Sequence, residues 1–235
     1  MLIFLIGITA CSSLGALSLN DLDALNDFYT GAGGNKWRWY DPKGAMWNFT
    51  AAYLDPTIPC SNVSSVMWQG LFCTYGCQKL SSCAITGILM DNSLIVGTLS
   101  SSLGKLNSLT LLNLAENFLS GTIPSNIFSN VSGLEQFYLS DNMLSGPFPD
   151  VSHSRHLTSL EISQNSLTGT IPSNIFVSKM RFFYIGFNQF SGTLPEQWSL
   201  WNESLYVLSI SFNKLTGTLP TIIGIFSQMN TLNVQ

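Results

Sequence analysis

The sequence contains few charged residues. Only 9% of its 235 residues are Asp, Glu, Lys or Arg, against about 25% in an ordinary soluble domain. Nine basic and thirteen acidic residues give a formal net charge of −4, and the basic residues form no cluster. This excludes an electrostatic surface for nucleic acid. Aromatic residues at 12% exclude a disordered chain. The mean hydropathy of +0.26 leaves either a membrane protein or a soluble protein that avoids charge.

Long hydrophobic runs are also scarce. The clearest, Leu2–Ala10, is shorter than the roughly 20 residues that span a membrane, and small residues follow it. This pattern predicts a secretory signal over residues 1–18, cleaved after Gly15 or at the end of that range. An uncleaved anchor, or an acylated Cys11, is the alternative. We expect a secreted or cell-surface extracellular chain, attached to a membrane only through a segment beyond Gln235.

Side chains that carry catalysis do not cluster. His153 and His156 lie three apart in a polar stretch next to Asp150, and we interpret both as solvated loop residues. The carboxylates are scattered, and no pair recurs at a fixed position. The Gly31–Gly34 run follows no predicted strand, and no serine-hydrolase, zinc-protease or phosphate-loop motif occurs. We therefore expect no enzymatic activity, no cofactor and no metal site.

The cysteines are concentrated in one segment. Cys11 falls in the expected signal, and the other four lie within 24 positions: Cys60, Cys73, Cys77 and Cys83. An even number in an exported chain indicates two disulfides, for which three connectivities exist. Zinc is the competing interpretation, but the spacing matches no common zinc pattern.

From about Ile85 onward the sequence repeats itself. A glycine recurs every 23–25 residues, at Gly97, Gly121, Gly146, Gly169, Gly192 and Gly217. The units around it read L-x-x-L-x-L-x-x-N-x-L-[ST]-G-T-[IL]-P. A period of this length with this template predicts leucine-rich repeats. We expect six repeats and the start of a seventh over residues 85–235.

The spacing within each unit predicts the fold. Apolar residues two apart, such as Leu112 and Leu114, share one face of a short strand. Strands from successive units stack in parallel, which gives an α/β solenoid: a right-handed superhelix with a parallel β-sheet on its concave face. Inward-turning asparagines satisfy buried backbone groups as a structural ladder, formed by Asn117, Asn142, Asn165, Asn188 and Asn213.

Side chains beside the buried strand positions point onto the concave face. They include an aromatic patch around one acidic group, which we call the concave patch: Gln136, Tyr138, Ser159, Glu161, Phe182 and Tyr184. Rigid aromatics offer contact area at low entropic cost, so the patch is a candidate binding surface. Ordinary surface aromatics without a ligand are the alternative. The tryptophans that precede the repeats are interpreted as core.

Four asparagines lie in N-x-[ST] sequons, at Asn48, Asn62, Asn130 and Asn202. Their number is what chance alone gives in a chain rich in Asn, Ser and Thr. Their positions are more informative, because none of them belongs to the asparagine ladder. We expect glycans at these four positions.

The repeats resemble a known family. Leu119–Pro124 (LSGTIP) and Leu215–Pro220 (LTGTLP), with Trp68–Cys73 (WQGLFC) before them, are similar to the plant-type extracellular leucine-rich repeats and their N-terminal cap. Those repeats occur in receptor-like kinases, receptor-like proteins and polygalacturonase inhibitors. The resemblance implies an N-terminal cap over residues 19–84. It also implies that Cys60 pairs with Cys73 and Cys77 with Cys83, and that a protein, peptide or cell-wall glycan binds the concave face.

A structural role is the alternative function. The solenoid could self-assemble, or bind an ordered surface such as ice through threonines that follow the repeat glycines: Thr98, Thr122, Thr170, Thr193 and Thr218. No capping motif follows the strand begun by Met229–Val234. We therefore expect either a fragment or an edge that another surface covers, with self-association through this edge.

Overall fold

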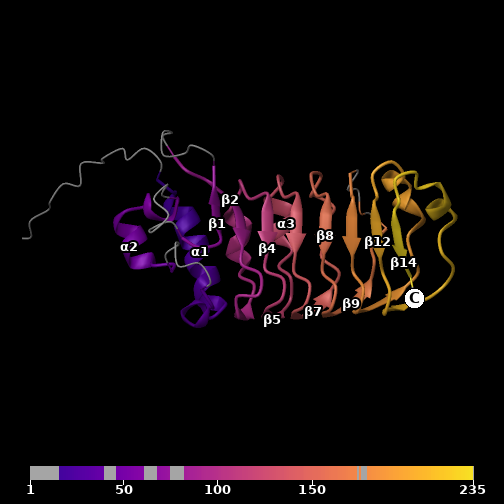
Figure 1. The fold of residues 1–235 in the computed structure, drawn as a ribbon, viewed down its shortest axis with the longest axis horizontal. Coiled ribbons are helices and arrows are strands. Elements are labelled where there is room, and N and C mark those ends of the chain that lie inside the picture. Colours follow the sequence, from indigo (N-terminus) through magenta and orange to yellow (C-terminus); the bar gives the residue numbers. More distant parts are fainter. Residues whose placement is uncertain are drawn as a thin grey trace, which may run out of the picture.

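The computed structural model describes residues 16–39, 46–60, 68–74, 82–173, 175 and 179–234. Most of the expected signal, together with Asn62 and Cys77, lies outside them. The described chain is an elongated solenoid with a helical cap at one end and stacked strands along its length (Figure 1). The predicted fold class is confirmed.

The N-terminal cap begins with α1 (Leu19–Gly31). Ser18 sets its start, because its side chain accepts a hydrogen bond from the Asp21 N–H at 3.1 Å. The apolar side of α1 is fully buried, and three tryptophans of the cap, Trp37, Trp47 and Trp68, are at most 4% exposed. Short helices follow: η1 (Gly34–Lys36), α2 (Phe49–Leu54) and η2 (Ile58–Cys60).

A disulfide and a short strand join the cap to the repeats. Cys60 and Cys73 are bonded, with 5.8 Å between their Cα atoms. Cys83 is also disulfide-bonded, and its expected partner Cys77 lies outside the described residues. The strand β1 (Leu71–Cys73) pairs antiparallel with the first strand of the repeats.

Eight strands form the larger sheet, and seven of them run parallel, one per repeat unit. After β1 the order is β2 (Ile85–Leu89), β4 (Leu111–Asn113), β6 (Gln136–Tyr138), β8 (Ser159–Glu161), β10 (Phe182–Tyr184), β12 (Val207–Ser209) and β14 (Thr231–Asn233). The central residue of each strand from β4 to β12 is fully buried, as residues two apart on one face require.

A second sheet of six strands runs along the solenoid. Its members are β3 (Val96–Thr98), β5 (Phe118–Gly121), β7 (Met143–Pro147), β9 (Ser166–Thr170), β11 (Gln189–Gly192) and β13 (Lys214–Leu215). The return path of each unit holds a short helix or turn, including η4 (Ser101–Lys105), α3 (Asn126–Asn130), η5 (Glu196–Trp201) and η6 (Thr221–Ile225). Apolar residues between the two sheets and these returns form one continuous core.

The five asparagines of the ladder make the same hydrogen bonds in successive units. Each Oδ1 accepts from a backbone N–H of the preceding unit, as Asn188 does from Leu167 at 3.0 Å. Each Nδ2 donates to carbonyls of its own and the preceding unit, between 2.9 and 3.3 Å. The ladder therefore satisfies backbone groups that would otherwise be buried without a partner.

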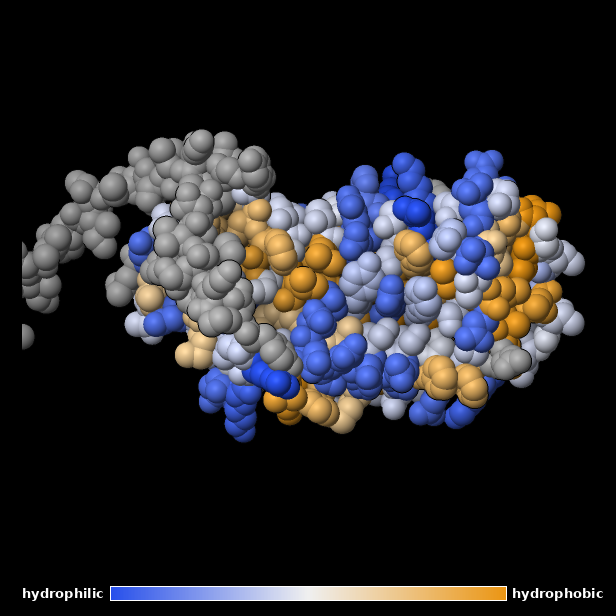
Figure 2. Space-filling model, viewed as in Figure 1, coloured by the Kyte–Doolittle hydropathy of each residue, from blue (hydrophilic) through white to orange (hydrophobic). Residues whose placement is uncertain are grey.

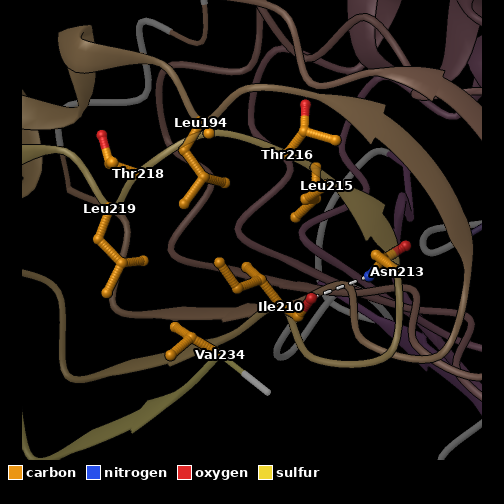
Figure 3. Close-up of a pocket in the computed structure, with 9 residues that line it drawn as sticks. Leu194, Ile210, Asn213, Leu215, Thr216, Thr218, Leu219 and Val234 are labelled. Atoms are coloured by element: carbon orange, nitrogen blue, oxygen red, sulfur yellow. Dashed lines mark hydrogen bonds between the residues drawn. The ribbon is translucent and has the colours of Figure 1, made fainter.

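The core opens at the C-terminal end. Figure 3 shows Leu194, Ile210, Leu215 and Leu219 around a cavity of about 340 Å³, beside Val234. Leu219 and Val234 are 45% and 38% exposed, and Figure 2 shows hydrophobic residues gathered on this end of the molecule. Apolar side chains thus face solvent here.

Candidate functional site

The concave patch occupies three adjacent strands in register. Tyr138 on β6, Glu161 on β8 and Tyr184 on β10 are direct partners across the sheet. Neighbouring strands lie about 4.8 Å apart, so the carboxylate sits between two tyrosine side chains. Repeats of nearly equal length produce this alignment, since each strand starts at the same point of its unit. The sequence-predicted residues are therefore brought together.

Glu161 is the electrostatic centre of the patch. It is half-buried, and the loss of solvent raises the pKa of its carboxyl, although a hydrogen bond from Ser159 opposes this at 3.4 Å. Burial and the nearby Glu161 charge together raise the pKa of Tyr184. Within the part of the chain that the structure describes, no Lys or Arg pairs with Glu161. A cationic group from a ligand would relieve this unpaired charge.

Ser159 departs from the prediction. It was expected to contribute contact surface, but it is only 2% exposed. Its partners across the sheet, Gln136 and Phe182, carry larger side chains that flank it on both sides. Ser159 thus acts on the patch through its hydrogen bond to Glu161. Gln136 is likewise engaged, because it accepts a hydrogen bond from the Tyr138 hydroxyl at 3.2 Å.

The structure adds two residues to one side of the patch. The Arg181 guanidinium lies 5.5 Å from the centre of the Phe182 ring, and Tyr206 packs edge-on against the same ring at 5.9 Å. Arg181 is exposed and Tyr206 is 42% exposed. Arg181 comes directly before β10, and Tyr206 comes directly before β12. The sequence carried a signal for Arg181, since it lies directly before Phe182 of the concave patch.

A stacked pair of phenylalanines was also missed. Phe187 and Phe212 lie 4.3 Å apart between ring centres at an interplanar angle of 16°, and are 49% and 59% exposed. Both adopt left-handed backbone conformations, with φ of 54° and 53°, directly before a ladder asparagine. Bulky residues seldom adopt this region. The repeated F-N dipeptide was the available signal, and it places an aromatic surface at one rim of the concave sheet.

The threonines of the alternative surface lie along the second sheet. Thr98, Thr170 and Thr193 are exposed, one per unit. Pro147 occupies the equivalent position in β7, and it interrupts the row. An ordered array of hydroxyls is therefore broken near its middle.

Three of the four expected glycosylation sites lie among the described residues, and they differ in exposure. Asn48 and Asn130 are exposed, whereas Asn202 is half-buried at the end of η5.

Among the described residues, no group of three His, Cys, Asp or Glu side chains is arranged to hold a metal ion. No helix in the described ranges combines the length and apolarity needed to cross a membrane.

Comparison with known proteins agrees with this architecture. The family model "Leucine Rich Repeat" matches residues 108–130, 156–177 and 204–226. Phytosulfokine receptor 1 from Arabidopsis thaliana is 32% identical over 130 residues, which is 55% of this chain and 11% of the receptor. The chain thus spans a small part of the length of that relative.

Solved structures show the same repeats. The plant peptide hormone receptor RGFR1, in complex with RGF2, matches with 32% identity and a TM-score of 0.56 over 60% of this chain and 22% of that chain. A chain of the BIR3–SERK2 complex from Arabidopsis thaliana matches with 25% identity and a TM-score of 0.63, over 85% and 97% of the two chains.

The fold and the comparisons together show that the protein is a leucine-rich repeat solenoid. In sequence the chain is similar to the plant receptors named above, and its N-terminal cap carries a disulfide, as the resemblance to the plant-type extracellular repeats implied.

Proposed function

We propose that this chain is an extracellular recognition module, without catalytic activity, whose concave face binds a peptide or an extended protein segment. The names of its relatives support this class of ligand, because RGFR1 is a peptide hormone receptor in complex with its ligand RGF2. Membership of a membrane-anchored receptor or of a secreted protein is compatible with the proposal.

The observation that carries the proposal is the unpaired carboxylate of Glu161. It is half-buried between Tyr138 and Tyr184, and desolvation raises its pKa. A neutral glycan would leave this charge without a partner. A Lys or Arg side chain of a peptide would pair with it, and charge-assisted hydrogen bonds are stronger than neutral ones.

Aromatic side chains on both sides favour an extended ligand. Phe182 and Tyr206 form one wall, and the stacked Phe187 and Phe212 form the opposite rim. Gly186, between the end of β10 and Phe187, is buried and contributes no side chain. Rigid aromatics around a narrow floor suit a peptide backbone flanked by apolar side chains.

Export is the second part of the proposal. A bonded Cys60–Cys73 pair fits an oxidising compartment. Leu17 is 4% exposed and its N–H donates to the Pro56 carbonyl at 3.0 Å, while Ser18 caps α1. Both residues therefore belong to the folded cap, which favours signal cleavage after Gly15.

Peptide selection tests the concave site. The purified protein is screened against a random peptide library, and affinities of enriched peptides are measured by biolayer interferometry. We expect enriched peptides to contain Lys or Arg and Glu161→Gln to weaken their binding at least about tenfold. Binding should also weaken as the pH falls through the raised pKa of Glu161, because protonation removes the charge.

Thr170→Ala is the matched control, since Thr170 is exposed on the second sheet, and it should leave binding unchanged. Tyr184→Ala should weaken binding through lost contact area. Peptides without a basic residue that bind wild type and Glu161→Gln equally would contradict the proposal.

A further inference from the structure

A separate hollow lies in the N-terminal cap. Its volume is about 510 Å³, within the range of about 300–1,000 Å³ typical of ligand pockets. It is lined by residues of α1, η1 and α2, by Trp39 after η1 and by residues just before α2, and by none of the concave patch. The recognition role proposed above does not use it.

The lining combines aromatic rings with neutral polar groups. The rings are Tyr29, Trp39, Trp47 and Phe49, of which Trp47 is buried and the other three are half-buried. Asparagine amides, threonine hydroxyls, Gly34 and Met46 complete it, and the described lining contains no charged residue. Aromatic faces contact the C–H groups of a sugar ring, while amides bind its hydroxyls. A neutral carbohydrate therefore fits this chemistry.

The aromatic rings hold one another in place. Tyr29 stacks against Trp47 at 6.3 Å and packs against Phe49 at 5.3 Å. Gly34 allows this arrangement, because a Cβ atom at this position would overlap the Tyr29 ring. The Trp47 indole N–H donates to the Gln69 carbonyl at 2.9 Å. The pocket is thus formed before any ligand arrives.

Asn48 lines the same pocket and begins a sequon that ends at Thr50. Its side chain is exposed, and its Oδ1 accepts a hydrogen bond from the Ala51 N–H at 3.1 Å as the cap of α2. The described contacts leave Nδ2, the atom that carries an N-linked glycan, without a hydrogen bond. Capping and glycan attachment therefore use different atoms of one side chain.

We propose that Asn48 carries an N-linked glycan whose first N-acetylglucosamine packs into this pocket. In the modification, Nδ2 of Asn48 loses a proton and bonds to the anomeric carbon of a lipid-linked oligosaccharide. The bond from that carbon to the lipid diphosphate breaks, and the diphosphate leaves. The proposal rests on export, as proposed above, and is independent of any ligand on the concave face.

Packing of the sugar would distinguish Asn48 from the other described sequons. Asn130 is exposed at the end of α3, and the aromatic ring near it in the sequence, Phe128, is fully buried in the core. A glycan on Asn130 would extend into solvent. Glycosylation at the two positions should therefore differ in its effect on stability.

The experiment uses the whole chain secreted from a eukaryotic host. Site occupancy is measured by mass spectrometry and the Tm by calorimetry. Thr50→Ala removes the sequon but keeps the Asn48 cap, Thr50→Ser keeps both, and Ser132→Ala removes the Asn130 sequon. We expect Asn48 to be occupied and Thr50→Ala alone to lower the Tm, by about 2–4 °C for a chain of this size.

Two further measurements test the sugar contact itself. An endoglycosidase that leaves a single N-acetylglucosamine should preserve the Tm. Trp39→Ala should lower the Tm more in the glycosylated protein than in Thr50→Ala, because the ring and the sugar are coupled.

Four results would overturn the proposal. An empty Asn48 beside an occupied Asn130 would do so, while showing that export took place. Equal Tm values for wild type and Thr50→Ala would show that the sugar does not pack in the pocket. Additive effects of Trp39→Ala and Thr50→Ala on the Tm would show the same. Saturable binding of free chitobiose by wild type, with Asn48 empty, would assign the pocket to a soluble sugar. The concave site would be unaffected in each case.

Discussion

The two ends of the solenoid differ in how the core and the outermost strand are covered. At the N-terminal end, β1 pairs antiparallel with the outer edge of β2, and aromatic residues such as Trp68 close the core. At the C-terminal end, β14 pairs with β12, and its residues Thr231–Asn233 are all exposed. A stack of similar units has two unlike ends, and among the residues that the structure describes only the N-terminal end is closed by a dedicated structure.

Charge reinforces the contrast between the ends. Residues 215–235 contain no Asp, Glu, Lys or Arg, although such residues commonly protect exposed strand edges. At the capped end the outermost strand is β1, which has only three residues, and so short an edge strand offers little to pair with. Within the described residues, neither charge nor a further pairing strand therefore protects the edge of β14.

The largest expected effect comes from breaking the capped end. Replacing both Cys60 and Cys73 by Ser should lower the free energy of unfolding by about 3 kcal/mol, the value expected for a loop of this length. Denaturant unfolding measures the loss. Amide hydrogen exchange should accelerate in β1 and α1 while β12 stays protected. Uniform acceleration along the whole solenoid would show instead that the cap and repeats unfold together.

Substitutions in the asparagine ladder should lower the free energy of unfolding by intermediate amounts. Asn188 is 7% exposed, so Asn188→Ala should cost about 2 kcal/mol by leaving buried backbone groups unpaired. Asn213 makes equivalent hydrogen bonds but lines the open cavity, where water can replace them. Asn213→Ala should therefore cost about 1 kcal/mol. Urea unfolding of both variants measures the difference, and equal losses would contradict the role of the open end.

The smallest effect on stability comes from charging the open edge. Val234→Lys should change the free energy of unfolding by no more than about 0.5 kcal/mol, because Val234 is 38% exposed. It should nevertheless abolish the concentration-dependent self-association that we expect of the wild type in sedimentation velocity. Leu19→Lys, at an exposed site of the capped end, is the control and should associate like the wild type. A monomeric wild type at high concentration would refute this expectation.

The repeats could be predicted closely because their determinants are local. An apolar pair two apart, a glycine and an asparagine at fixed positions define each turn, and nearly equal repeat lengths bring Tyr138, Glu161 and Tyr184 side by side. The burial of Ser159 could not be predicted in this way. Its exposure depends on the sizes of Gln136 and Phe182, which lie on other strands.

The pocket of the N-terminal cap could not be predicted either, because it also depends on contacts between distant segments. Three of the cap tryptophans, Trp37, Trp47 and Trp68, are core as predicted, but the half-buried Trp39 lines a pocket with Tyr29 and Phe49, and these segments share no period. No spacing rule relates these positions, and nothing in the sequence places Tyr29 and Trp39 beside the Asn48 sequon, to which Phe49 belongs.

The sequence by itself determined the solenoid, its period and the residues of its ladder, because each unit repeats one set of short-range interactions. Only the tertiary structure decided how the ends differ, which concave side chains reach solvent, and that Phe187 stacks on Phe212. The physical reason is that these properties depend on packing between units and across the cap, where neighbours in space are distant in the chain.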